Sequence, residues 1–139
     1  MVEALIRRPK AGEEDGVRSV VQTVADEIYG GLWAPAPVPI DEEDWSVAWV
    51  AIVETRIAGI VLTNDEWISD LWVLRENRGH GIGKKLLARG EAEIAERGRG
   101  TFRLRVVKSN TLAVSFCLRH GWRVDREFPN KDYPSRCWR

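Results

Sequence analysis

The chain has 139 residues, 44% of them hydrophobic, and its 21 basic and 21 acidic side chains leave a formal net charge of zero. This length suits one domain with a single core. The apolar fraction is that of an ordinary globular protein, which excludes the disordered and fibrous classes. A dedicated nucleic-acid binder would show a basic excess, so we expect no nucleic-acid partner.

The amino-terminal segment and the cysteines bear on where the protein works. Residues Met1 to Lys10 are charged from Glu3 onward and lack the apolar run of a signal peptide, and no segment approaches the ~18 apolar residues of a membrane span. Cys117 and Cys137 are too few for a disulfide scaffold. We therefore expect a cytoplasmic protein with reduced thiols and no membrane partner.

The first half of the chain predicts a strand, a helix and an antiparallel meander. The strand covers Ala4 to Arg8, and valines at helical spacing between Val17 and Ile28 predict the helix. A proline-rich loop spans Leu32 to Pro39, and Asp41 to Trp45 suits one helical turn. Three β-rich runs then form the meander: Val47 to Glu54, Ile57 to Thr63 and Trp67 to Leu74.

The second half predicts two helices that alternate with strands. One helix begins at Ile82 and stops at Gly98, and the other runs from Thr111 to His120 behind Asn110 as its N-cap. The predicted strands are Phe102 to Val107, Trp122 to Glu127 and Arg136 to Arg139. No internal repeat or linker interrupts the pattern, so residues 1–139 predict a single α+β domain.

A glycine-rich turn, Arg78 to Lys84, separates the third β-rich run from the next helix. Its glycines at alternate positions, Gly79, Gly81 and Gly83, let successive backbone N–H groups converge without Cβ obstruction. The helix start adds further N–H groups and its dipole, and Arg78, Lys84 and Lys85 add positive charge. The turn therefore predicts a phosphate or pyrophosphate site, with a ligand-free glycine turn as the alternative.

Two common nucleotide loops do not fit this turn. A P-loop needs Gly-x-x-x-x-Gly-Lys followed by Ser or Thr, whereas Arg78 stands five positions before Gly83 and Lys85 follows Lys84. A dinucleotide fingerprint needs a third glycine where Leu86 stands, and it needs parallel strands. Neither nucleotide loop therefore explains the turn, and both another phosphate ligand and a ligand-free turn stay open.

Two motifs together resemble the GCN5-related N-acetyltransferase (GNAT) superfamily. The pattern Arg78-x-x-Gly81-x-Gly83, after the strand ending Leu71-Trp72-Val73, resembles motif A, and the stretch from Asn110 to Trp122 is similar to motif B. The resemblance covers about Val47 to Glu127. It implies a mixed, mostly antiparallel central sheet of about six or seven strands, flanked by about four helices, with a splayed V-shaped cleft.

The resemblance also implies acetyl-CoA as the co-substrate and no metal. In that family the pyrophosphate binds the glycine turn, and the pantetheine arm pairs with the backbone of the preceding strand as an added strand would. A plain N-cap role for Asn110 is compatible with binding. The residues so assigned to the cofactor are Leu71, Trp72, Val73, Arg78, Gly79, His80, Gly81, Ile82, Gly83, Lys84 and Asn110.

The implied reaction is direct transfer of the acetyl group to a primary amine of a small molecule or peptide. A backbone N–H near Val73 would stabilise the oxyanion. Motif B commonly carries a tyrosine as general acid where this chain has Cys117, which is either that acid or a packing residue. If Cys117 is a packing residue, then Tyr133, Tyr29 or water would donate the proton. Glu66 and Asp70 are candidate bases, unless they are merely solvated charges.

Further partners follow from the same resemblance. The loop with Trp33 and the acidic run Asp41 to Asp44 would attract a cationic amine, or the acidic run simply caps a short helix. Many members of the family dimerise through their terminal strands, and the ending Trp138-Arg139 is compatible with such a homodimer. The rival hypothesis, motivated by Cys117, is an acyl-CoA-binding module without transfer activity.

Overall fold

The computed structural model describes residues 3–29, 44–106, 110–127 and 135–138. Within these ranges it contains three α-helices: α1 (Glu14–Tyr29), α2 (Ile82–Glu96) and α3 (Thr111–Arg119). Two short 3-10 helices are η1 (Trp45–Val47) and η2 (Arg75–Asn77). The strands are β1 (Leu5–Arg7), β2 (Trp49–Val53), β3 (Arg56–Asn64), β4 (Trp67–Val73), β5 (Arg103–Val106), β6 (Arg123–Glu127) and β7 (Ser135–Trp138).

The described strands form one open sheet in the order β1-β2-β3-β4-β5-β7-β6. Strand β4 pairs with β5 in parallel, whereas β1 with β2, β2 with β3, β5 with β7 and β6 with β7 pair antiparallel. The expected mixed, mostly antiparallel sheet is therefore confirmed. Among the described residues three α-helices accompany it, where about four were expected.

The chain divides into two compact units. The first comprises Met1–Leu62 and Asp70–Gly90, and the second comprises Thr63–Ser69 and Glu91–Arg139. Strands β3 and β4 and helix α2 each contribute residues to both units. The pairing of β4 with β5, Trp67 with Arg103 and Ile68 with Leu104, lies within the second unit. The expected V-shaped cleft stays a prediction.

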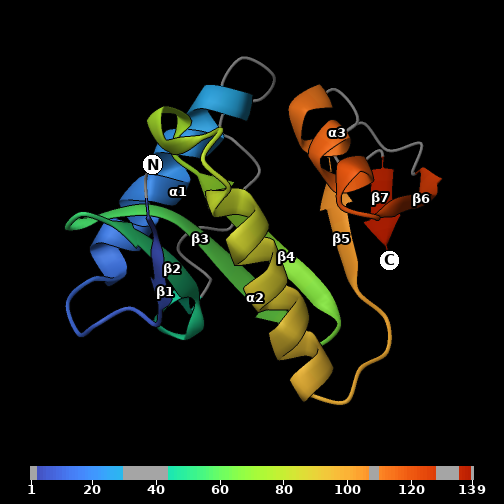
Figure 1. Ribbon diagram of the computed structural model, residues 1–139, viewed down its shortest axis with the longest axis horizontal. Coiled ribbons are helices and arrows are strands. Elements are labelled where there is room, and N and C mark those ends of the chain that lie inside the picture. The colour runs from blue at the N-terminus through green and yellow to red at the C-terminus, as the bar shows by residue number, and fades with distance from the viewer. Residues whose placement is uncertain (1–2, 30–43, 107–109, 128–134, 139) are drawn as a thin grey trace. The chain divides into compact units, whose positions relative to one another are not determined.

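The first unit has its core on one face of β2 and β3. Val17 and Val21 of α1 are fully buried there against Ile60 and Leu62, together with Trp45. On the other face, a Cβ placed on Gly59 would lie 3.0 Å from Leu86 Cδ1 of α2. Neighbouring strand residues point to opposite faces. Helix α1 and the first turns of α2 therefore cover opposite faces of β3 (Figure 1).

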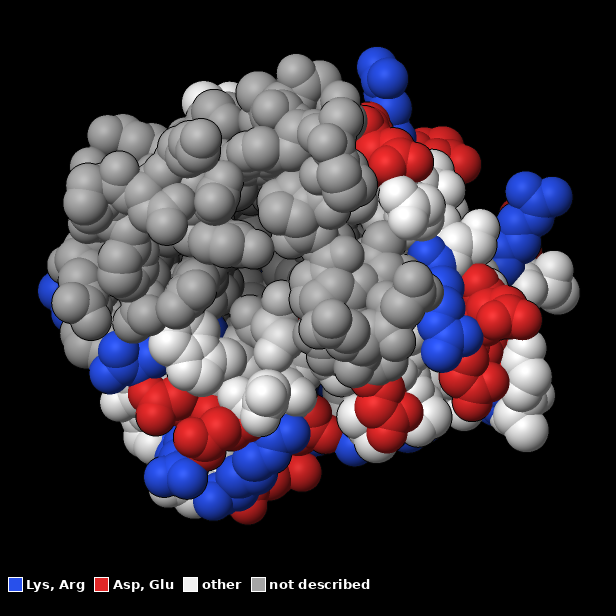
Figure 2. Space-filling model, turned by 180° about the vertical axis from the view of Figure 1, so that it is seen from behind, with Lys and Arg blue, Asp and Glu red and all other residues white. Residues whose placement is uncertain are grey.

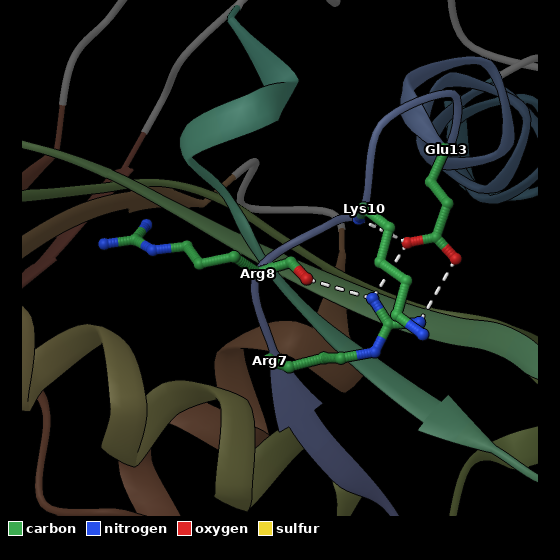
Figure 3. A network of polar contacts seen from close by, with 4 residues as sticks. All are labelled: Arg7, Arg8, Lys10 and Glu13. Carbon is green, nitrogen blue, oxygen red and sulfur yellow. Dashed lines mark hydrogen bonds and ion pairs between the residues drawn. The ribbon is translucent and has the colours of Figure 1, made fainter.

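An ion pair fixes the corner between β1 and α1 (Figure 3). The Arg7 guanidinium donates to both carboxylate oxygens of Glu13, at 2.8 and 3.1 Å, and the Lys10 backbone N–H donates to Oε1 at 2.6 Å. The Arg7 hydrogen bond, followed by that from Lys10, lowers the pKa of Glu13 to about 2. This carboxylate thus joins the first strand to the start of the first helix.

In the second unit, helix α3 begins at Thr111 as predicted and ends at Arg119, one residue before the predicted end. The Asn110 side chain accepts a hydrogen bond from the Ala113 N–H at 3.3 Å, and Gly121 adopts a φ of 85° just after the helix. Trp122, only 1% exposed, donates from its indole to Glu91 at 3.1 Å. The predicted N-cap and C-terminal glycine are therefore confirmed.

Several boundaries differ slightly from those predicted. The turn between β2 and β3 lies at Glu54-Thr55, one residue earlier than expected, because Glu54 adopts the left-handed conformation with a φ of 60°. The short helical turn begins at Trp45, where Asp44 caps it by accepting from the Ser46 N–H. The proline-rich loop and residues 41–43 lie outside the described residues.

Surface charge and helix length are relevant to the expectation of neither a nucleic-acid nor a membrane partner. On the face shown in Figure 2, described Lys and Arg side chains are interspersed with Asp and Glu side chains. Among the helices of the described ranges, none is long and apolar enough to cross a membrane.

Candidate functional site

The site is built in the first unit, from the end of β4 to the start of α2. The Leu74 N–H donates to the Ala58 carbonyl of β3 at 2.8 Å. Because successive residues of an extended chain direct their polar backbone groups to alternate sides, the N–H and C=O of Val73 face the opposite edge of β4. This edge carries the backbone groups that the sequence predicts for ligand pairing.

Gly59 of β3 allows a close approach to β4 on the side of β4 that faces β3. A Cβ at Gly59 would lie 2.7 Å from the Trp72 carbonyl oxygen and 3.3 Å from the Val73 Cα. Side chains do not tolerate such distances to backbone atoms, so only glycine fits here. The position of the last residues of β4 therefore depends on Gly59, a residue that the sequence analysis did not assign to the site.

The glycine turn has the backbone that an anion site requires. Gly79 and Gly81 adopt φ values of 83° and 80°, and a Cβ at either position would have nothing within 4 Å. Both residues are exposed. Positive φ at alternate positions turns backbone N–H groups toward one side, and the open space leaves room for a ligand beside them.

Helix α2 begins at Ile82, directly after Gly81, so the last residues of the predicted Arg78–Lys84 turn already belong to the helix. Ile82 is 2% exposed and Leu86 is fully buried, which anchors this end of the helix in the first unit. The first turn of a helix leaves backbone N–H groups without intrahelical acceptors, and its dipole adds positive potential. Lys84 and Lys85 are exposed on the same turn. The geometry suits a phosphate group.

The sequence predicts that Arg78 binds the phosphate. In the structure, its guanidinium instead donates hydrogen bonds to protein groups. Its Nε donates to the Val73 carbonyl at 3.1 Å, and its two terminal nitrogens donate to the Glu27 carboxylate at 2.8 Å each. Glu27 lies on α1, 51 residues away in sequence. No local sequence signal pairs these two residues, so the sequence analysis missed Glu27.

Of the two candidate bases, Asp70 belongs to the first unit and Glu66 to the second. Asp70 is 7% exposed, and its Oδ1 accepts a hydrogen bond from the Trp72 indole at 2.9 Å. Trp72 packs against the core beneath α1. Glu66 forms an ion pair and hydrogen bond with Arg103 of β5. Asp70 is thus a buried carboxylate on β4, whereas Glu66 is paired with a cation.

The remaining candidates lie in the second unit or outside the described residues. Asn110 caps α3, and Cys117 on the same helix is buried, with 4% exposure. Tyr133 and Trp33 lie outside the described residues, as does the side chain of Tyr29. Within the described ranges, no group of three or more His, Cys, Asp or Glu side chains could hold a metal ion.

A comparison with models of protein families shows to which family the chain belongs. The model of the Acetyltransferase (GNAT) family matches residues 19–122, which include the β4 edge, the glycine turn, α2 and α3. The chain belongs to the GNAT acetyltransferase family. The resemblance predicted from the two motifs is thereby confirmed. The sequence matches none of the curated proteins with which it was compared.

Solved structures share the GNAT fold along nearly the whole chain. PaiA N-acetyltransferase from Thermoplasma acidophilum, crystallised in complex with coenzyme A, is 18% identical with a TM-score of 0.79, covering 96% of this chain and 98% of its own. A GNAT acetyltransferase from Staphylococcus aureus Mu50 is 15% identical with a TM-score of 0.77, covering 99% and 98%. YncA from Salmonella typhimurium, determined with its cofactor acetyl-CoA, is 12% identical with a TM-score of 0.74, covering 98% and 91%.

Proposed function

We propose that this GNAT protein is an N-acetyltransferase that moves the acetyl group of acetyl-CoA to a primary amine of a small molecule or peptide. The observation that carries the proposal is the glycine turn at the start of α2. Gly79 and Gly81 have positive φ and open space beside them, and Lys84 and Lys85 are exposed on the following helical turn. Solved relatives of the same fold bind coenzyme A and acetyl-CoA.

The residues present fit the co-substrate. The pyrophosphate of coenzyme A carries the negative charge that a helix start and two lysines attract. Its pantetheine arm carries amides, which suit the edge of β4 formed by Leu71 and Val73. Asn110 stays a predicted contact of this arm. Acetyl-CoA supplies a thioester, whose carbonyl an amine attacks directly.

The reaction needs a hydrogen-bond donor to the carbonyl oxygen of the thioester, and the end of β4 would supply it. The Val73 N–H faces the edge opposite β3, where it would donate to the carbonyl oxygen as negative charge develops there. The ammonium of the acceptor must lose a proton, and the departing thiolate must gain one. We assign the removal of the ammonium proton to Asp70, which would act through water because the residue is only 7% exposed. The proton donor stays a prediction, with Tyr133 as a candidate.

The proposal also covers the domain organisation, the location in the cell and the assembly of the protein. Residues 1–139 would act as a single acyltransferase domain located in the cytoplasm, where acetyl-CoA is available. The homodimer through terminal strands stays a prediction. The sheet edges among the described strands are β1 and β6, so a partner strand would add beside one of these.

A thiol-release assay tests the proposal. Acetyl-CoA is incubated with the protein and a panel of polyamines, aminoglycosides, amino acids and peptides with free N-termini, while coenzyme A binding is measured separately by calorimetry. We expect amine-dependent release of free thiol. Tight coenzyme A binding without turnover on any amine would instead support the acyl-CoA-binding module, which Cys117 in place of the family's tyrosine favours.

Replacement of Asp70 tests its role as the base. Asp70→Asn keeps an oxygen that can accept the Trp72 indole N–H, so the fold should persist, while turnover should fall about 100-fold. Glu76→Gln, which neutralises an exposed carboxylate of η2, is the matched control and should leave turnover unchanged. An Asp70→Asn enzyme with a normal kcat would remove Asp70 from the mechanism.

A further inference from the structure

Arg78 joins three parts of the first unit. Its Nε donates to the Val73 carbonyl at the end of β4, and its fork of terminal nitrogens binds both oxygens of Glu27 on α1. The two side chains are 31% and 28% exposed, so the pair is partly shielded from water. Arg78 itself is the first residue of the glycine turn. One side chain therefore connects the strand, the turn and the first helix.

We propose that Glu27 and Arg78 are positioning residues of the coenzyme A turn, and that Arg78 does not bind phosphate. The inference rests on the proposed function, since it concerns how the turn is held for its ligand. Three of the five guanidinium N–H donors bond to protein groups, and the facing carboxylate balances the charge. A phosphate would have to displace a bidentate carboxylate to reach it.

The placement of Glu27 supports this role. It lies in the last turn of α1, which ends at Tyr29 and carries no basic residue in that turn. A carboxylate at a helix C-terminus is disfavoured by the helix dipole. The cation that offsets this effect comes from the glycine turn, 51 residues along the chain. The pair therefore couples the end of α1 to the start of the site.

The Arg78 bond also sets how an amide ligand can pair with β4. It engages the Val73 carbonyl, which lies on the edge facing away from β3. Residues two apart present their polar groups to the same edge. A ligand that pairs with this edge would therefore use the Val73 N–H and the backbone groups of Leu71. Arg78 thus leaves the Val73 N–H for the reacting carbonyl.

Glu27→Gln distinguishes a positioning role from phosphate binding, because the two roles predict opposite signs. If Arg78 positions the turn, loss of the bidentate pair loosens it, and the Kd for coenzyme A rises about 3- to 10-fold. If Arg78 binds phosphate, removal of the competing carboxylate frees it, and coenzyme A binds more tightly. Asp26→Asn is the matched control, because Asp26 precedes Glu27 on α1 and accepts from Gln22 at 2.7 Å.

Arg78→Lys and Arg78→Gln form the second arm of the experiment. Lysine keeps the charge and lacks the planar fork, so a positioning role predicts that both variants weaken coenzyme A binding equally. Adding Glu27→Gln to Arg78→Gln should then have no further effect. The KM for acetyl-CoA should rise in Glu27→Gln, while kcat at saturating acetyl-CoA stays within twofold of the wild type.

The outcomes separate this inference from the proposed function. Equal or tighter binding by Glu27→Gln, or wild-type affinity in Arg78→Lys, overturns the positioning role while coenzyme A binding by the wild type stands. A wild-type protein that binds no coenzyme A overturns the proposed function, and the inference with it. Thermal unfolding of each variant shows whether it is folded at the temperature of the titration.

Discussion

At the scale of single residues, Cys117 combines a reactive side chain with a structural position. The residue is 4% exposed, and its backbone carbonyl accepts from the N–H groups of Trp122 and His120, at 3.0 and 3.1 Å, where α3 ends. A cysteine is shorter than the tyrosine that the family commonly carries here. Burial favours the packing role over proton donation, which needs contact with the leaving thiolate.

We therefore expect Cys117→Ala to retain activity. Removal of one buried sulfur atom should lower the free energy of unfolding by about 1 kcal/mol and leave kcat within threefold of the wild type. Turnover at saturating acetyl-CoA, together with thermal unfolding, checks both values. A fall in kcat of about 100-fold in a folded variant would restore Cys117 as the general acid.

Glu13 shows how a single carboxylate makes stability depend on pH. Its pKa is lowered to about 2 in the folded protein by hydrogen bonds from Arg7 and from the Lys10 backbone. A lowered pKa means that the folded state favours the ionised form, so its contribution is complete above the ordinary value of about 4.5. That contribution is lost as the pH falls from about 4.5 toward 2.

Glu13→Gln should therefore lower Tm at pH 7, and the difference from the wild type should shrink as the pH approaches 2. Thermal unfolding followed by circular dichroism at intervals between these pH values measures the difference. Glu14→Gln, a substitution at the adjacent acidic residue in the first turn of α1, is the control. A difference between wild type and Glu13→Gln that stays constant with pH would exclude the linkage.

At the scale of elements, β3 determines the position of the end of β4. Gly59→Ala would place a Cβ 2.7 Å from the Trp72 carbonyl and 3.0 Å from Leu86 Cδ1. Because the first of these atoms is backbone, β4 must move. We expect a loss of about 1–3 kcal/mol in the free energy of unfolding and a rise in the KM for acetyl-CoA.

The control for this substitution is Gly100→Ala, where a Cβ would have nothing within 4 Å. It should change neither Tm nor KM. Chemical denaturation and steady-state kinetics measure both variants. A Gly59→Ala protein with unchanged stability and KM would show that β4 does not depend on this close approach.

The elements differ in how far the sequence predicts them. Local patterns sufficed for the N-cap at Asn110, the turn at Gly79 and Gly81 and the helix start at Ile82, because each depends on residues a few positions apart. The ion pair of Glu27 with Arg78 spans 51 residues. Such pairs arise from tertiary packing, and no periodicity within one element encodes them.

A local sequence pattern also does not predict which polar groups the fold buries. Asp70 and Glu66 look alike in the sequence, one as a carboxylate within the β-rich run Trp67 to Leu74 and the other as a carboxylate directly before it. The fold buries the first beside the Trp72 indole and places the second against Arg103. Which carboxylate is shielded depends on the strands and helices around β4. The sequence therefore predicted the candidates for the base, and only the structure distinguishes their environments.

At the scale of the whole molecule, the family assignment rests on features spread through both units. The family model spans residues 19–122, and the solved relatives match nearly all of the chain at identities below 20%. Such distant likeness establishes the fold, and the ligand follows from residues of this chain. We propose that the turn beginning at Arg78 binds the pyrophosphate of coenzyme A.

Calorimetric titration of coenzyme A into the wild type, Gly81→Asp and Gly12→Asp tests this claim most directly. Gly12, like Gly81, has a positive φ, 88° against 80°, and open space, but lies before α1, so it controls for backbone strain. We predict that the wild type and Gly12→Asp bind equally well, while Gly81→Asp binds at least ~100-fold more weakly because its carboxylate faces the phosphates. Equal affinity of Gly81→Asp and the wild type, or no binding by the wild type, would contradict the account.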